Sequence, residues 1–177
     1  MLKKLATTGG SSWYWLAVIV LGLCMEAVAL FYQYALDYGP CVLCIHVRIW
    51  TLGIVLVALV TLLVRRVWSL CAIGHALIAI IAAALLERSW RLLGTERGTI
   101  LGDCSMESGL PTWLALDQWF PSLFGIWEAC GYTPKLLFGV TMAEALLVFS
   151  VILLLVSIIF VVTILLNRKA AGRSHTS

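Results

Sequence analysis

Four long apolar runs constrain the fold of this chain more than any other feature of its sequence. At 1.5 Å per residue, about 20 residues form a helix that can cross about 30 Å of hydrocarbon. Charged residues make up 12% of the 177 residues, whereas about 25% is usual in a soluble domain. The sequence therefore predicts one integral membrane domain, 1–177, folded as an all-α bundle of four membrane-spanning helices. The predicted spans are 13–32, 45–64, 67–86 and 145–166.

The basic residues indicate how these spans are oriented, because segments rich in lysine and arginine stay in the cytoplasm during insertion. One side of the predicted bundle lacks acidic residues and carries Lys3, Lys4, Arg65, Arg66, Arg168, Lys169 and Arg173. We therefore expect both termini in the cytoplasm and outer loops at 33–44 and 87–144. The net charge of +3 then reflects topology rather than nucleic-acid binding.

A signal peptide is the alternative for the first run, because Ala27-Val28-Ala29 resembles a small-residue cleavage site. The apolar run continues through Leu30-Phe31-Tyr32 without a polar break, and Glu26 directly precedes the site. We therefore favour a retained first helix. Glu26 is an ionisable group inside a span, to which the sequence assigns no role.

Two cysteines directly precede the second apolar run, in Pro40-Cys41-Val42-Leu43-Cys44-Ile45-His46-Val47-Arg48. Two thiols with two residues between them can close a small disulfide, and Pro40 is suited to open a helix. The backbone N–H groups and dipole at a helix start stabilise a thiolate. Arg48 lies four residues after Cys44, on the same helix face, where it adds positive charge beside a thiolate or a reducible oxygen ligand. The motif indicates a redox centre; a structural disulfide or half of a zinc site are the alternatives.

The histidines do not favour a metal centre. His46 lies about 28 Å from the cytoplasmic edge and His75 about 14 Å, so the two cannot ligate one haem iron. His175 lies in a polar tail, and a zinc site needs four ligands close together. We expect no metal, and His75 is predicted to be a buried core residue.

The long outer segment contains Cys104 and Cys130 on either side of an aromatic stretch. Its apolar positions 113, 116, 120, 123 and 127 have helical spacing, interrupted by Pro121. This pattern predicts a short amphipathic helix on the outer leaflet, with a small cap packed on itself as the alternative. Of the six cysteines, Cys24 and Cys71 fall within spans, and the other four form two pairs on the oxidising side.

The motifs together resemble the disulfide bond formation protein B (DsbB) family over most of the chain. They are the cysteine segment at 40–48, Asp103 beside Cys104, Leu-Ala-Leu-Asp-x-Trp-x-Pro at 114–121, and Cys130. The resemblance implies a four-helix protein of the bacterial inner membrane, with periplasmic loops, that couples dithiol oxidation to a quinone. Such proteins help to keep the periplasm oxidising.

The resemblance also implies roles for individual residues. Cys41 and Cys44 would pass electrons to ubiquinone or menaquinone. Cys104 and Cys130 would accept them from a soluble thioredoxin-fold oxidase of the DsbA type. Arg48 matches the family arginine at the quinone, and Arg91 stands where the well-known enzyme has a histidine near the quinone. Cys44, Arg48 and Arg91 are therefore the predicted quinone-binding residues.

Two other functions are compatible with four outer cysteines. An oxidase of the vitamin K epoxide reductase type shares the mechanism, but the order of motifs and the lack of a fused thioredoxin domain in this sequence argue against it. A scaffold or transporter subunit would use both pairs as structural disulfides, which should resist mild reductant and show no dependence on quinone. We expect the quinone-coupled oxidase.

Overall fold

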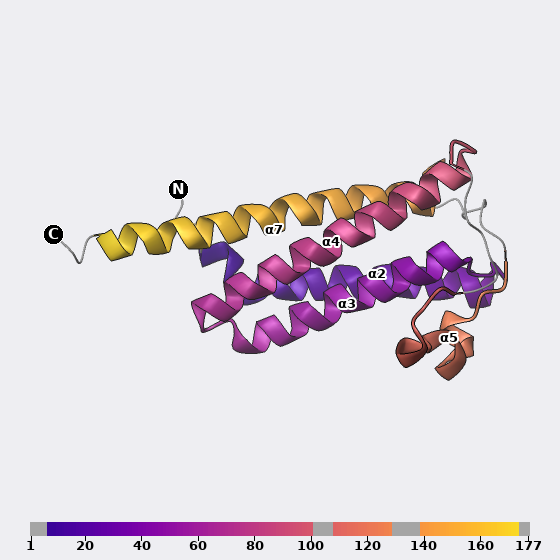
Figure 1. The fold of residues 1–177 in the computed structure, drawn as a ribbon, viewed down its shortest axis with the longest axis horizontal. Coiled ribbons are helices and arrows are strands. Elements are labelled where there is room, and N and C mark those ends of the chain that lie inside the picture. The colour runs from indigo at the N-terminus through magenta and orange to yellow at the C-terminus, as the bar shows by residue number, and fades with distance from the viewer. Residues whose placement is uncertain (1–6, 101–107, 129–138, 174–177) are drawn as a thin grey trace.

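The computed structural model describes residues 7–100, 108–128 and 139–173, with side chains described up to residue 167 (Figure 1). Within these residues, four helices are long and apolar enough to cross a membrane. They are α2 (Ser12–Ala35), α3 (Val42–Val64), α4 (Trp68–Glu96) and α7 (Met142–Arg173). The predicted all-α, four-span architecture is confirmed.

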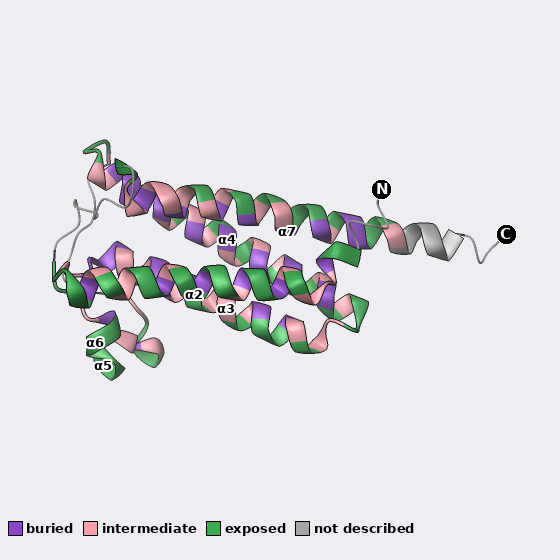
Figure 2. Cartoon of the chain, turned by 180° about the vertical axis from the view of Figure 1, so that it is seen from behind, coloured by how far each residue is buried: buried purple, intermediate pink, exposed green. Residues whose placement is uncertain are grey.

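The long helices lie side by side along the length of the molecule, and each packs mainly on its neighbour in the chain. α2 packs on α3, α3 on α4, and α4 on α7 (Figure 1). Buried positions follow the inward faces, whereas many leucine, isoleucine and valine side chains on the outward faces are exposed (Figure 2). Helices that are apolar all round are typical of a bundle that lies in lipid.

Small residues let α3 and α4 approach closely. A Cβ atom added to Gly74 on α4 would overlap three side-chain atoms of Thr61 on α3. A Cβ atom added to Gly53 on α3 would have its nearest neighbour, Ile81 Cδ1, at 3.9 Å. Small residues at interfaces are the usual means of close helix packing in membranes.

The third span is longer than the predicted 67–86, because α4 continues to Glu96. An ion pair between Glu87 and Arg91, one helical turn apart, supports the added turns. The helix ends at Glu96, and Gly98, two residues later, has a φ of 67°, which glycine readily adopts. The N–H groups of Thr99 and Ile100 then bond to the carbonyl of Gly94. The first ten residues of the predicted outer segment 87–144 are therefore helical and continue α4.

The second and fourth spans also begin earlier than predicted. Cys41 caps α3, and its sulfur accepts a hydrogen bond from the N–H of Cys44 at 3.2 Å. Thr141 and Glu144 form a reciprocal capping box at the start of α7, in which each side chain bonds the other residue's N–H. Capping thus adds about one turn to each predicted helix.

The aromatic segment forms three short turns instead of one amphipathic helix. They are η1 (Thr112–Leu114), α5 (Leu116–Trp119) and α6 (Pro121–Phe124). Pro121 lacks an N–H group and restricts the residue before it, and Phe120 has φ −133° and ψ 66°. The predicted break at Pro121 is present, but the chain breaks again at Ala115. Trp113, Trp119 and Phe120 remain exposed.

Substitution of the two glycines tests the close approach of α3 and α4. We expect Gly74→Ala to lower the free energy of unfolding by about 1–3 kcal/mol, because the added methyl group meets Thr61. Gly53→Ala is the matched control and should be neutral or stabilising by up to about 1 kcal/mol, because alanine favours helix. Thermal unfolding in detergent measures both. Equal midpoints for the two variants would contradict this packing.

Candidate functional site

The first pair of cysteines forms a disulfide at the start of α3. Cys41 and Cys44 are joined with their Cα atoms 5.0 Å apart. Cys41 is buried, whereas Cys44 is half-buried and therefore the more accessible sulfur. Pro40 precedes the N-cap instead of occupying the first helical position. The pair lies at the helix N-terminus, where unpaired N–H groups and the dipole favour negative charge on sulfur.

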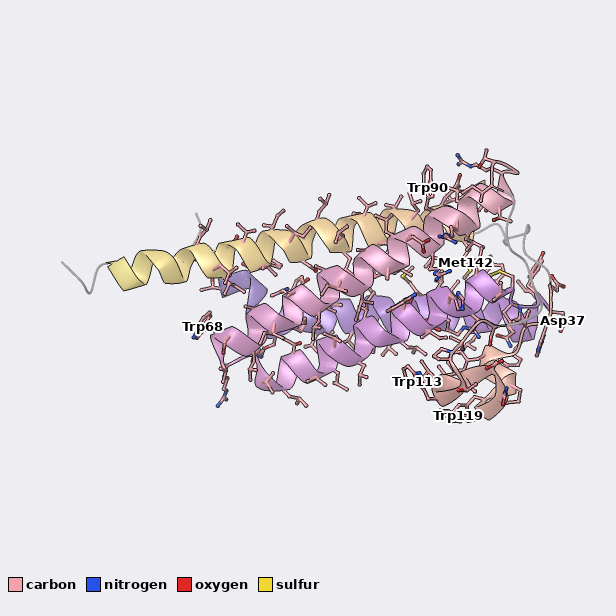
Figure 3. All side chains as sticks on the ribbon, in the orientation of Figure 1. Asp37, Trp68, Trp90, Trp113, Trp119 and Met142 are labelled. Carbon is pink, nitrogen blue, oxygen red and sulfur yellow. A yellow bond between two sulfur atoms is a disulfide. The ribbon has the colours of Figure 1, made fainter. Side chains whose placement is uncertain are left out.

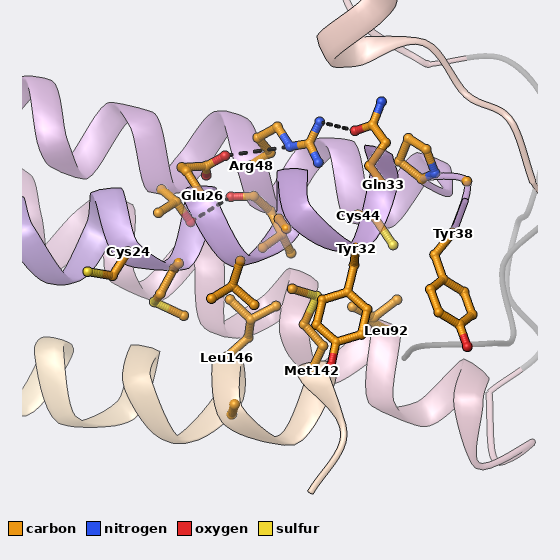
Figure 4. Close-up of a pocket in the computed structure, with 18 of the residues that line it drawn as sticks. Cys24, Glu26, Tyr32, Gln33, Tyr38, Cys44, Arg48, Leu92, Met142 and Leu146 are labelled. Carbon is orange, nitrogen blue, oxygen red and sulfur yellow. Dashed lines mark hydrogen bonds and ion pairs between the residues drawn. The ribbon is translucent and has the colours of Figure 1, made fainter. Parts of the chain in front are cut away.

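A cavity of about 250 Å³ lies directly beside this disulfide. Cys44 and residues of α2 and α3 line one side, and Leu92, Met142 and Leu146 from α4 and α7 line the other (Figure 4). Most lining residues are apolar. The polar groups are confined to a few side chains, chiefly Glu26, Gln33 and Arg48.

Arg48 is the only arginine among the described residues that line this cavity, and its side chain is almost fully buried. Its Nη1 donates to Gln33 Oε1 at 2.9 Å and also to the carbonyl of Leu123. Its Nε lies 3.5 Å from Glu26 Oε2 (Figure 4). That Nε–H makes no hydrogen bond within the described residues. The positive charge of Arg48 therefore borders an apolar cavity, where it can attract an oxygen acceptor.

Glu26 and Gln33 are site residues that sequence reasoning missed. Both belong to α2, are buried, and lie seven residues apart, which puts them on one helix face. Glu26 was visible as an ionisable group inside a span, which is a sign of function. No local pattern links either residue to Arg48, because their contact joins two different helices.

The segment 108–128 packs over the end of α2 and the start of α3, where the disulfide lies. Gln33 Nε2 donates to the carbonyl of Ser122 at 2.9 Å, and the N–H of Trp127 donates to the carbonyl of Pro40 at 3.1 Å. His46 Nε2 lies 2.8 Å from the carbonyl of Ser108. Both ends of this segment are thus held beside the disulfide.

The second pair of cysteines, Cys104 and Cys130, lies outside the described residues, as does Asp103. In sequence, Cys104 comes four residues before Ser108, and Cys130 comes three residues after Trp127. The role predicted for this pair stays a prediction.

Arg91 is not brought together with Arg48. Its exposed side chain pairs with Glu87 on the same helix, and the adjacent Leu92 lines the cavity instead. Arg91 is not among the residues that line this cavity. Its predicted contact with a quinone stays a prediction.

The remaining cysteines and histidines lie in other surroundings. Cys24 is exposed on α2 and lines the cavity. Cys71 is buried near the other end of the bundle. His75 is fully buried, as predicted, with Nε2 3.0 Å from the carbonyl of Gly9. In the part of the chain that the structure describes, no three His, Cys, Asp or Glu residues form a metal-binding group.

Comparison with known proteins gives consistent matches along most of the chain. The family model described as disulfide bond formation protein DsbB matches residues 11–160. Disulfide bond formation protein B of Shewanella denitrificans is 30% identical over 95% of this chain and 97% of its own length. Disulfide bond formation protein B 2 of Pseudomonas aeruginosa is 35% identical over 83% of this chain and 90% of its own. The Haemophilus influenzae protein B is 29% identical over 96% and 97%.

Proposed function

The chain belongs to the family of disulfide bond formation protein DsbB, and from this premise we propose that it oxidises a periplasmic dithiol protein and transfers the electrons to a membrane quinone. Family membership makes it a multi-pass membrane protein with a role as a disulfide-forming oxidoreductase. The proposal adds the electron donor, a thioredoxin-fold oxidase of the DsbA type, and the acceptor, ubiquinone or menaquinone.

One observation carries the proposal. The more accessible cysteine of the disulfide, Cys44, lines the same apolar cavity as Arg48, whose charged side chain is buried. A quinone has an apolar ring and tail, two carbonyl oxygens that accept hydrogen bonds, and the ability to take up two electrons. The cavity offers an apolar wall, a charged donor and a redox-active sulfur to such a molecule.

The reaction at this cavity balances without another reactant. Reduced Cys41 and Cys44 lose two electrons and two protons as their S–S bond forms, and the quinone takes up both to become a quinol. Arg48 would hold a carbonyl oxygen of the quinone and stabilise the negative charge that develops there. Glu26 and Gln33 contact the guanidinium from α2 and would keep it in place.

The loop cysteines would supply electrons to this centre. In the proposed relay, the partner's thiolate attacks Cys104, and Cys130 leaves as a thiolate. The partner closes its own disulfide, and Cys130 then attacks the Cys41–Cys44 disulfide, so that Cys104 and Cys130 are rejoined when the inner pair is reduced. Each step is a thiol–disulfide exchange that conserves electrons and protons.

The proposed location is the bacterial inner membrane, with both termini in the cytoplasm and the cysteine pairs on the periplasmic side. The distribution of charge in the sequence supports this orientation, because the segments next to the other ends of the spans carry basic residues and no acids.

The order of attack in the relay is tested with single cysteine variants. In Cys130→Ser and in Cys104→Ser, the remaining loop thiol is first oxidised to a mixed disulfide with glutathione. Each variant is then incubated with a thioredoxin-fold partner that lacks its own resolving cysteine, whose thiolate displaces the glutathione. We expect a stable mixed disulfide through Cys104 in the Cys130→Ser variant, because neither Cys130 nor a second thiol of the partner remains to attack it. Non-reducing electrophoresis and mass spectrometry identify the adduct. An adduct only through Cys130 would reverse the order, and none through either would favour a structural disulfide.

Arg48→Lys tests the quinone contact. A lysine keeps the charge but cannot copy the planar fork of donors, so kcat/KM for the quinone should fall about 10- to 100-fold, the range for a lost charge-assisted hydrogen bond. Turnover in detergent with added ubiquinone or menaquinone measures this. Exchange between the partner and Cys104–Cys130 should be nearly unchanged.

Arg91→Ala is the comparison for this experiment, because Arg91 is exposed and does not line the cavity. Its effect on kcat/KM should be smaller than that of Arg48→Lys. A larger effect would assign the quinone contact to Arg91. Turnover of the unchanged protein that is independent of both quinones would contradict the proposed function itself.

A further inference from the structure

A second cavity lies at the end of the bundle opposite the disulfide, which we call the arginine end after Arg65 and Arg66. Its volume is about 300 Å³. It lies between the turn that joins α3 to α4, the residues before α2, and α7. Figure 3 shows Trp68, one of its lining residues, at the far end of the molecule from Asp37 and Trp113. The lining includes Arg65, Arg66, Trp68, Ile164 and Asn167.

The two arginines at this cavity differ from every other arginine whose side chain is described. Arg48 pairs with Glu26, Arg88 and Arg91 pair with Glu87, and Arg97 pairs with Glu144. Among the described residues, no carboxylate forms an ion pair with Arg65 or Arg66. The arginine end thus gathers positive charge that the described residues do not neutralise.

The sequence explains why no carboxylate is present there. All nine acidic residues lie between Glu26 and Glu144, and none lies within 20 residues of the Arg65–Arg66 turn. The side-chain carboxylates of the described residues therefore leave these guanidinium groups open to an anion from outside the chain. Two adjacent guanidinium groups suit a phosphate, because each offers several N–H donors in a fixed plane.

The fold holds one of these groups in place. Arg65 Nη1 donates to the carbonyl of Gly10 at 3.1 Å, which ties the end of α3 to the residues before α2. Trp68 opens α4, and the N-cap residue Val67 provides no side-chain cap. The positive end of the α4 dipole adds to the attraction for an anion at this end.

The apolar residues around the cavity suit a lipid better than a soluble anion. Ile164 lines the cavity, and Leu70 and Ile73 lie exposed on the next turns of α4 toward the middle of the bundle. Acyl chains can pack along such a surface while the headgroup stays among the arginines. Trp68, which is half-exposed, is suited to the boundary between headgroups and acyl chains.

We propose that the cavity at the arginine end binds the phosphate headgroup of an anionic glycerophospholipid from the adjacent leaflet. Basic pockets between membrane helices are known to bind anionic headgroups. The bound lipid would offset part of the positive charge of Arg65 and Arg66 and join the α3–α4 turn to α7. The site lies at the opposite end from the proposed quinone cavity and does not depend on the proposed function.

Native mass spectrometry of the detergent-purified protein tests this site, with phosphatidylglycerol as the probe and phosphatidylcholine as the zwitterionic comparison. The unchanged protein should bind phosphatidylglycerol more tightly. Arg66→Gln should weaken that binding about fivefold, and the double variant Arg65→Gln/Arg66→Gln about 25-fold, from the usual contribution of one basic residue near a lipid surface. Arg88→Gln removes an arginine at the other end and should leave binding unchanged.

A competition experiment distinguishes a lipid headgroup from a soluble phosphate, and a single variant keeps the test valid if the double variant does not fold. Millimolar glycerol 3-phosphate should not displace the lipid; displacement would show a site for soluble anions and overturn the proposal. Arg66→Gln removes no hydrogen bond of the described fold, so it remains informative if the double variant does not fold. Equal phosphatidylglycerol affinity in Arg66→Gln and the unchanged protein, or no preference over phosphatidylcholine, would also overturn the proposal.

Discussion

The burial of one guanidinium group governs the organisation of the cysteine-bearing end of this protein. A charge inside a membrane bundle is unfavourable unless it is paired and hydrogen-bonded. Arg48 meets this requirement with Glu26 and Gln33 from α2 and with the carbonyl of Leu123 from the outer segment. One side chain of α3 therefore contacts both α2 and the segment 108–128.

This arrangement places the disulfide and the guanidinium of Arg48 beside the same cavity. Cys44 and Arg48 lie one turn apart on α3, so the helix alone determines their spacing. The contacts from α2 then hold the guanidinium beside the cavity. In the proposed reaction, the same residues that satisfy a buried charge would also hold the electron acceptor beside the reactive sulfur.

The two ends of the bundle balance their charge in different ways. At the end with the disulfide, Arg88, Arg91 and Arg97 pair with carboxylates of the chain. At the arginine end, Arg65 and Arg66 have no such partner among the described residues, and the sequence places no acid nearby. This asymmetry supports the orientation that we propose, and it leaves one face of the molecule complementary to anionic lipid.

The sequence by itself determined the features that depend on local order along the chain: the four spans, the Cys41 and Cys44 pair at a helix start, and Arg48 one turn below. Hydrophobic runs and residue spacing carry this information directly. The tertiary structure alone decided that Glu26 and Gln33 contact Arg48, that Arg91 faces away from the cavity, and that Arg65 and Arg66 share a cavity with α7. These contacts join residues far apart in sequence, and no local periodicity specifies which faces of two helices meet.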